Sequence, residues 1–103
     1  MKKFKIKIDY FEVMRKIDNN PKVTQRQLAN NLDFSLGKLN YCLKALKNKG
    51  LIKMRNFKNN PKKINYFYIL TPKGVLEKTK LTINFMRRKM MEYQELKREL
   101  EKN

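Results

Sequence analysis

The sequence predicts a mainly helical fold with a small β-hairpin (class α+β) and a long C-terminal helix. Apolar residues recur at helical spacing in four segments, and capping residues stand at the starts of these segments. Two short alternating runs enclose a polar turn with a proline, which is typical of a hairpin. The 103 residues suffice for one domain with a modest core. We expect a compact unit over residues 8–71 and a separate helix over 72–101.

Two short helices are expected first. Asp9 is placed to cap the first helix, whose apolar stripe includes Phe11 and Ile17. Asp18-Asn19-Asn20-Pro21 should end it, because proline cannot continue a helix. Thr24-Gln25-Arg26-Gln27 has the residues of a capping box, in which the threonine and the second glutamine satisfy each other's backbone amides. The second helix should therefore begin at this point.

A third helix is expected over about residues 36–49, after a tight turn at Asp33-Phe34-Ser35 that lets Ser35 act as its cap. Gly50 should end it. On a helical wheel, one side carries an apolar stripe with Cys42 at its border: Leu36, Leu39, Leu43 and Leu46. The opposite side carries Gly37, Asn40, Tyr41, Lys44 and Asn48. The helix should bury the first side and expose the second.

The hairpin and the last helix follow. Residues 51–57 alternate, with Ile52 and Met54 on one face and Lys53 and Arg55 on the other, and residues 64–70 form an aromatic-rich second strand. Lys58-Asn59-Asn60-Pro61-Lys62 makes the turn between them. Thr71-Pro72 has the residues of a helix start. The helix that follows should run about 29 residues, or about 43 Å.

Charge is concentrated in the middle of the chain. There are 26 Lys+Arg against 9 Asp+Glu, a net charge of +17. No acidic residue occurs from Phe34 to Leu76, whereas four glutamates and only three basic residues follow Lys89. This distribution predicts that the middle segment contacts a polyanion.

Three helices followed by a hairpin is the order of a winged helix-turn-helix, whose third helix enters the major groove of double-stranded DNA. Asn40 has the donor and acceptor that match adenine, and Gly37 lacks a Cβ where the helix would approach DNA closely. Lys38 and Lys44 can reach guanine or phosphate, and Tyr41 a phosphate or a thymine methyl group. The full set of candidate DNA-binding residues is Thr24, Gln25, Arg26, Ser35, Gly37, Lys38, Asn40, Tyr41, Lys44, Arg55, Lys58, Asn59, Lys62 and Lys63.

The sequence also resembles a known family. Residues 24–29, 35–46 and 50–52, together with Leu70-Thr71-Pro72-Lys73-Gly74, are similar to segments of MarR-type winged-helix regulators. Residues 40–46, 56–59 and several positions between Leu81 and Tyr93 resemble the small MarR-type regulators associated with exopolysaccharide gene clusters. The resemblance implies transcriptional regulation. MarR-type proteins have a further N-terminal helix that shapes a ligand pocket, and only seven or eight residues precede the first helix expected here. We therefore do not expect small-molecule sensing.

The last helix carries a broken heptad that predicts a homodimer. A helix of this length cannot bury its whole stripe against so small a body. The candidate dimerisation residues are Leu76, Ile83, Met86, Met90, Tyr93 and Leu100. The alternatives are a helix that packs only on its own domain and a basic amphipathic helix on a membrane surface, which the distal glutamates disfavour.

Other classes of function are less consistent with the sequence. Without histidine, and with one cysteine, the chain has neither a His-based general base nor a His/Cys zinc site, so we expect no enzyme, metal or cofactor. Cys42 is either a redox sensor or a small buried side chain, and the second interpretation is favoured. The aromatic residues leave open an RNA or single-strand binder, and a basic adaptor protein is a further alternative. No membrane-spanning run occurs, which favours the cytoplasm.

Overall fold

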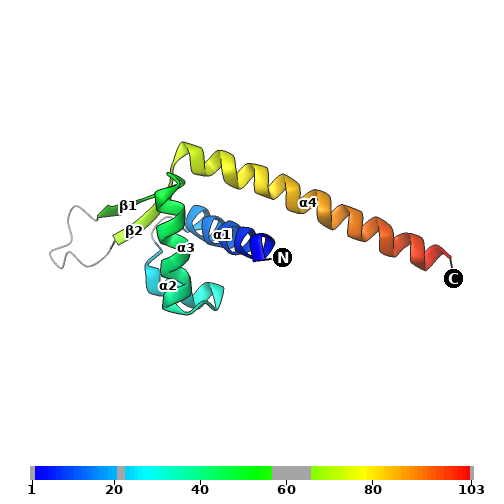
Figure 1. The fold of residues 1–103 in the computed structure, drawn as a ribbon, viewed down its shortest axis with the longest axis horizontal. Coiled ribbons are helices and arrows are strands. Elements are labelled where there is room, and N and C mark those ends of the chain that lie inside the picture. The colour runs from blue at the N-terminus through cyan, green and yellow to red at the C-terminus, as the bar shows by residue number, and fades with distance from the viewer. Residues whose placement is uncertain (1, 21–22, 57–65, 103) are drawn as a thin grey trace.

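The protein, described here from a computed structural model, has the predicted order of elements over residues 2–20, 23–56 and 66–102. Figure 1 shows how the first helices, the hairpin and the long last helix are arranged. Their bounds are α1 (Lys2–Asn19), α2 (Gln25–Leu32), α3 (Leu36–Asn48), β1 (Ile52–Asn56), β2 (Tyr66–Leu70) and α4 (Pro72–Glu101). The tip of the predicted hairpin lies outside the described residues.

The first helix begins earlier than predicted. It starts at Lys2 and has 18 residues, so the expectation that Asp9 caps it, with seven or eight residues before it, is wrong. No proline or glycine interrupts residues 2–19, so nothing in the local sequence prevents the helix from starting there. The Asp9 carboxylate lies instead on the side of the helix, 3.4 Å from Lys38 Nζ.

The predicted caps of α2 and α3 are confirmed. Thr24 Oγ1 accepts from the Gln27 amide at 3.2 Å, and Gln27 Oε1 accepts from the Thr24 amide at 3.0 Å. Asp33 ends α2 in the left-handed conformation, with φ 56°. Ser35 Oγ then accepts from the Lys38 amide at 3.1 Å. Only Asp33, Phe34 and Ser35 separate the two helices, so their relative placement is tightly constrained.

The core lies where α1, α2, α3 and the hairpin meet. It contains Leu39, whose burial the helical wheel predicted, together with Met14, Leu28 and Ile52, and Cys42, which is 2% exposed rather than at a border. The prediction for Leu36 is wrong, because this residue is 53% exposed. It lies in the first turn of α3, at the edge of the apolar stripe, where no other element covers it.

The hairpin is antiparallel, with Ile52 opposite Leu70 and Met54 opposite Tyr68. Ile52 and Tyr68 face the core, while Met54, on the same face but nearer the tip, is 38% exposed. Lys53 and Arg55 are exposed on the other face, as predicted.

The start of α4 is fixed against the end of α3. Thr71 caps α4 by accepting from the Gly74 amide at 3.0 Å, and its hydroxyl donates to the carbonyl oxygen of Gly50 at 2.6 Å. The Thr71 amide donates to Leu51 O at 3.0 Å. Gly74 is buried directly against that same carbonyl group. The Leu-Thr-x-x-Gly segment therefore sets the direction in which α4 leaves the hairpin.

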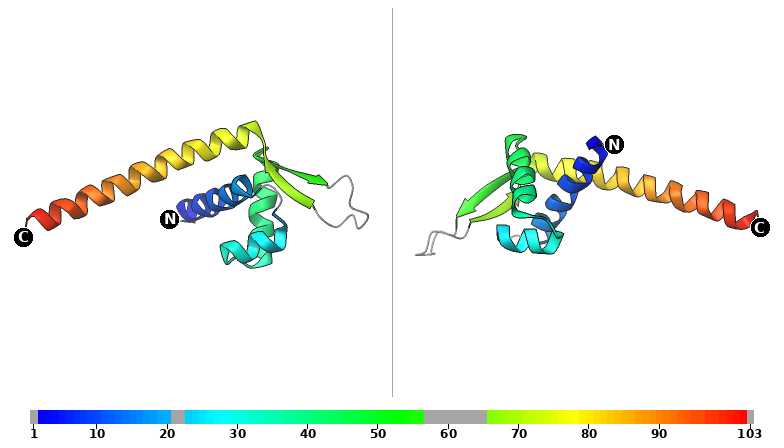
Figure 2. Two further views of the ribbon diagram at one scale, coloured as in Figure 1. Left: turned by 180° about the vertical axis from the view of Figure 1, so that it is seen from behind. Right: turned by 60° about the horizontal axis from the view of Figure 1, so that its bottom comes forward.

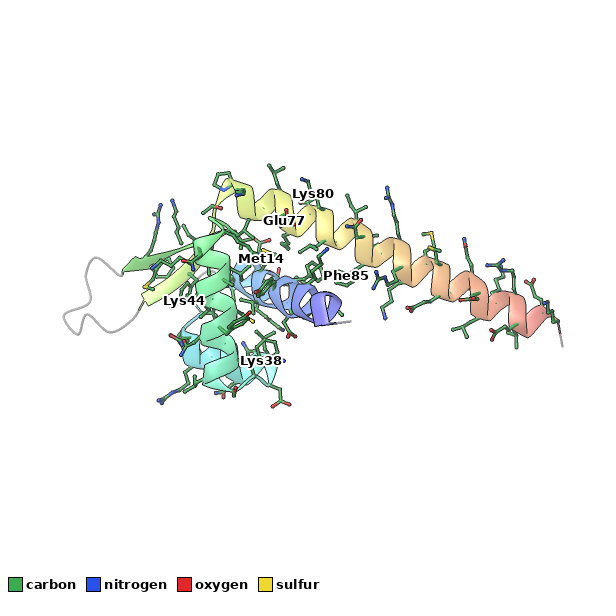
Figure 3. All side chains as sticks on the ribbon, viewed as in Figure 1. Met14, Lys38, Lys44, Glu77, Lys80 and Phe85 are labelled. Carbon is green, nitrogen blue, oxygen red and sulfur yellow. The ribbon has the colours of Figure 1, made fainter. Side chains whose placement is uncertain are left out.

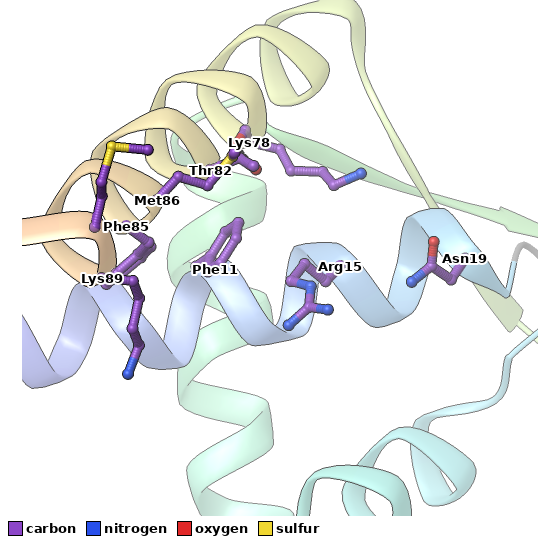
Figure 4. A pocket seen from close by; sticks show the side chains of 9 residues that line it. Phe11, Arg15, Asn19, Lys78, Thr82, Phe85, Met86 and Lys89 are labelled. Carbon is purple, nitrogen blue, oxygen red and sulfur yellow. Dashed lines mark hydrogen bonds between the residues drawn. The ribbon is translucent and has the colours of Figure 1, made fainter. Parts of the chain in front are cut away.

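Among the described residues, the first half of α4 supplies most of its packing on the rest of the chain. The rings of Phe11 and Phe85 stack with centroids 4.9 Å apart, and Lys78 forms an ion pair with Asp18. Figure 4 shows these aromatic residues in a groove of about 640 Å³ between α1 and α4. Beyond the groove α4 projects away from the body, which gives the chain extents of 65 × 27 × 23 Å (Figure 2). In the described part of the chain, no helix has the length and hydropathy to cross a membrane.

Candidate nucleic-acid interface

The outer face of α3 is exposed and polar, as the helical wheel predicted. Gly37, Asn40, Lys44 and Asn48 are exposed, and Tyr41 is 62% exposed. A Cβ built on Gly37 would meet no atom within 4 Å, so this position is open to an approaching molecule. Behind this face, α3 is anchored by its buried residues, which are Leu39, Cys42, Leu43 and Leu46. The helix can therefore present its outer face as a rigid surface.

Lys38 does not lie on this face with Lys44. Its ammonium group is 3.4 Å from the Asp9 carboxylate and 4.1 Å from the centroid of the Phe34 ring. Figure 3 shows Lys38 and Lys44 on different sides of α3. The geometry thus gives Lys38 a contact with α1 and the inter-helix turn. The Lys38 side chain is nevertheless 40% exposed, so its predicted contact with DNA stays a prediction.

The N-terminus of α2 lies beside the outer face of α3. Gln25 Nε2 donates to Asn40 Oδ1, which joins two residues that are 15 positions apart in the sequence. Arg26, next to Gln25, is exposed. The hydroxyl oxygens of Thr24 and Ser35 accept hydrogen bonds from backbone amides at the helix starts. These two predicted DNA-binding residues therefore have described contacts within the protein itself.

The hairpin adds positive charge at one end of the interface. Lys53 and Arg55 are exposed on β1, opposite Ile69 and Phe67 on β2. The four other predicted contacts of the wing lie outside the described residues, and their DNA-binding role stays a prediction: Lys58, Asn59, Lys62 and Lys63.

The side of α3 that faces α1 carries a group of polar residues. Burial raises the pKa of Tyr10, and its electrostatic interaction and hydrogen bond with Tyr41 raise this pKa further. Burial also raises the pKa of the Cys42 thiol, with Asp9 acting in the same direction and Lys38 opposing it. A buried thiol with a raised pKa is a weak nucleophile. These properties favour the interpretation of Cys42 as a small core residue rather than a redox sensor.

The aromatic residues of β2 do not form a single flat surface. Tyr68 is 7% exposed and faces the core, whereas the neighbouring Phe67 lies on the opposite face and is half-buried. Burial raises the pKa of Tyr68. A platform for stacked bases requires aromatic rings on one exposed face. The described strand therefore offers little support for single-strand binding.

The second candidate surface is the uncovered apolar side of α4. All six predicted dimerisation residues are between 44% and 77% exposed: Leu76, Ile83, Met86, Met90, Tyr93 and Leu100. Leu96 and Met91, which the heptad pattern did not include, are also exposed. Met86 and Met90 also line the groove beside Phe11 and Phe85, so the apolar surface continues from α4 toward α1.

Comparison with known proteins agrees with this geometry. Residues 11–53 match a family model described as winged helix-turn-helix DNA-binding. No curated protein matches the sequence significantly.

Several solved structures, among them a MarR protein, are similar over most of the chain. Staphylococcus aureus MarR in complex with salicylate and kanamycin has a TM-score of 0.70 and 20% identity, covering 84% of this chain and 57% of that one. Streptococcus pneumoniae FabT in complex with DNA has a TM-score of 0.67 and 24% identity, covering 85% and 59%. The PcaV regulator from Streptomyces coelicolor, in complex with its natural ligand, has a TM-score of 0.69 and 14% identity, covering 89% and 72%. The chain thus spans less than two thirds of the first two proteins. These likenesses establish the winged helix-turn-helix fold with a long C-terminal helix.

Proposed function

We propose that this chain is a sequence-selective, double-stranded DNA-binding transcription regulator of the MarR type. The observation that carries the proposal is the outer face of α3, which is exposed and polar and lies in a segment without acidic residues from Phe34 to Leu76. An α-helix fits the major groove, where side chains can distinguish all four base pairs. In this arrangement α3 reads the bases, and the wing formed by β1 and β2 contacts the backbone or minor groove.

The individual residues then have different tasks. Asn40 contacts a base edge, and Gly37 allows close approach because it has no Cβ. Lys44 and Arg55 are exposed and bind phosphates, which adds affinity that depends on salt rather than on sequence. Lys38 stabilises the placement of α3 on α1 through Asp9.

The proposal includes a homodimer formed through α4. The six exposed apolar residues named above, with the groove at Phe11 and Phe85, make a surface that the body of the chain does not cover. A second copy has the matching apolar surface. Two winged units joined in this way would place their α3 helices about 34–36 Å apart, or a multiple of this distance, on an inverted repeat. We accordingly divide the chain into a DNA-binding unit that ends near residue 71 and a dimerisation helix over 72–101.

The finer assignment rests on the motifs in the sequence. The resemblance of residues 40–46 and 56–59 to regulators of exopolysaccharide gene clusters supports control of such genes. A regulator of this kind acts in the cytoplasm and is not an enzyme. The predicted lack of a small-molecule ligand is now open to test, because α1 is longer than the sequence suggested and forms a groove with α4.

The test is selection of bound sites from a pool of random duplex DNA, followed by competition with scrambled duplex, single-stranded DNA and RNA. We expect an enriched motif that the protein binds at least about a thousandfold more tightly than scrambled duplex at physiological salt. Equal binding to all duplexes would favour a basic adaptor protein. Preference for single strands would favour the RNA or single-strand alternative, and either result would refute the proposal.

A further inference from the structure

Two amide side chains from different helices meet at the centre of the candidate interface. Gln25 is the first residue of α2, and Asn40 lies on the exposed face of α3. Gln25 Nε2 donates a hydrogen bond to Asn40 Oδ1. An asparagine amide has an acceptor at one end and two donors at the other. With Oδ1 held by Gln25, the Nδ2 donors point away from α2.

The backbone of Gln25 is held in place by its neighbours. It follows Thr24, whose side chain and amide both form the capping box with Gln27. One turn further, Leu28 is fully buried in the core. The backbone of Asn40 is equally constrained, because the preceding residue, Leu39, is also fully buried. The two side chains therefore meet between fixed helices.

We infer that Gln25 is a positioning residue that sets which base Asn40 reads; this inference rests on the proposed binding of duplex DNA by α3. A free asparagine can rotate its amide by half a turn and offer either end to a base. The Gln25 contact selects the orientation in which Nδ2 donates toward the groove. A carbonyl oxygen has two lone pairs, so Oδ1 can still accept one bond from a base. This orientation suits adenine, which offers the N7 acceptor and the N6 donor.

Two single substitutions should invert this preference by different routes. Asn40→Asp keeps an oxygen for Gln25 to donate to but replaces the outward donor with an acceptor. Gln25→Glu replaces the donor with a carboxylate, which repels Oδ1 and favours the rotated amide of Asn40 with its oxygen toward the groove. Both variants should therefore prefer cytosine, whose N4 amino group is a donor, at the position where the wild type selects adenine.

The control is Asn30→Asp. Asn30 is an exposed residue of α2, and no hydrogen bond joins its side chain to Asn40 in the part of the chain that the structure describes. This variant adds the same negative charge on the same helix. Any general loss of affinity caused by charge repulsion from DNA should be the same for Asn30→Asp and Gln25→Glu. The preferred base should change only in Gln25→Glu.

The experiment is parallel site selection from random duplex DNA with the full-length wild type and these three variants. We expect the wild type and Asn30→Asp to prefer adenine over cytosine about tenfold at one position of each half-site. In Gln25→Glu and Asn40→Asp the ratio should reverse at that position, with the rest of the motif unchanged. A helix-packing role for Gln25 would lower affinity without changing the preferred base.

Each other outcome is decisive. Retention of adenine by Gln25→Glu would overturn the inference, even if Asn40→Asp changes the preferred base. The inference would also be overturned if Gln25→Glu and Asn40→Asp both lost all DNA binding while Asn30→Asp still bound DNA. Gln25 and Asn40 would then provide affinity rather than select a base. If the wild type enriches no motif, the proposed function itself fails.

Discussion

Gly74 should be indispensable for the placement of α4, and substitution by alanine tests this directly. A Cβ at residue 74 would lie 1.9 Å from the carbonyl oxygen of Leu51 and 2.9 Å from its carbonyl carbon. Both atoms belong to the backbone, so rotation of a side chain cannot relieve the overlap. Real Cβ atoms essentially never lie under 3.0 Å from such an atom, so the first turn of α4 would have to move by at least about 1 Å, and ordinary van der Waals contact begins only at 3.4 Å.

The expected loss of stability follows from the contacts that this movement disturbs. Overpacking costs about 1–3 kcal/mol. Weakening of the 3.0 Å hydrogen bond from the Thr71 amide to Leu51 O adds about 0.5–1.5 kcal/mol. The better helix propensity of alanine offsets up to about 1 kcal/mol. We therefore expect Gly74→Ala to lower the free energy of unfolding by about 1–3 kcal/mol.

Gly37→Ala is the matched control, because a Cβ there meets nothing within 4 Å. Inside α3 this change should stabilise the fold by up to about 1 kcal/mol while weakening DNA binding, where the new methyl group obstructs close approach. Urea unfolding followed by circular dichroism, at equal protomer concentration, measures both variants. If Gly74→Ala is as stable as the wild type, the described packing of α4 on Leu51 is incorrect.

Three further outcomes are expected. The double variant Met86→Glu, Met90→Glu should sediment as a folded monomer and bind the operator much more weakly, because each half loses the effective concentration that its partner provides. A wild type that sediments as a monomer at about tens of micromolar would contradict the dimer. Lys44→Ala should weaken binding to every duplex about equally and reduce the slope of the logarithm of the binding constant against the logarithm of the salt concentration by about 1. A loss confined to one sequence would instead show that Lys44 reads a base. The free energy of unfolding should fall as the pH rises above about 9, because the raised pKa values of Cys42 and Tyr68 keep these groups protonated in the native state after the unfolded chain ionises at its ordinary values of 9.0 and 10.0. Urea unfolding at about pH 7.5 and pH 10 measures this, and equal stability at the two pH values would contradict the raised pKa values.

Features with local causes could be predicted from the sequence. The caps at Thr24, Ser35 and Thr71 depend on side chains that bond to backbone amides three residues away, so the pattern itself contains both partners. The hairpin and the exposed face of α3 follow from periodicity in the same way. The exposed stripe of α4 was predictable because its length exceeds what the body can cover.

Features that depend on distant partners could not be predicted. The ion pair between Lys38 of α3 and Asp9 of α1 could not be read from the pattern of either helix. The early start of α1 has no cap or breaker to mark it in the sequence. The Gln25–Asn40 contact and the approach of Gly74 to Leu51 join residues that only the folded chain brings together. In each case the deciding contact is between elements rather than within one.

In the proposed complex, two copies of the chain place their α3 helices in successive major grooves of one duplex. Methylation interference on the selected site measures this directly, because methylation of guanine N7 blocks contacts in the major groove. We expect two clusters of interfering guanines, related by two-fold symmetry and separated by about one helical turn, or a multiple of it, on one face of the DNA. A single cluster without symmetry, or no interference at any guanine of a guanine-containing site, would contradict the account.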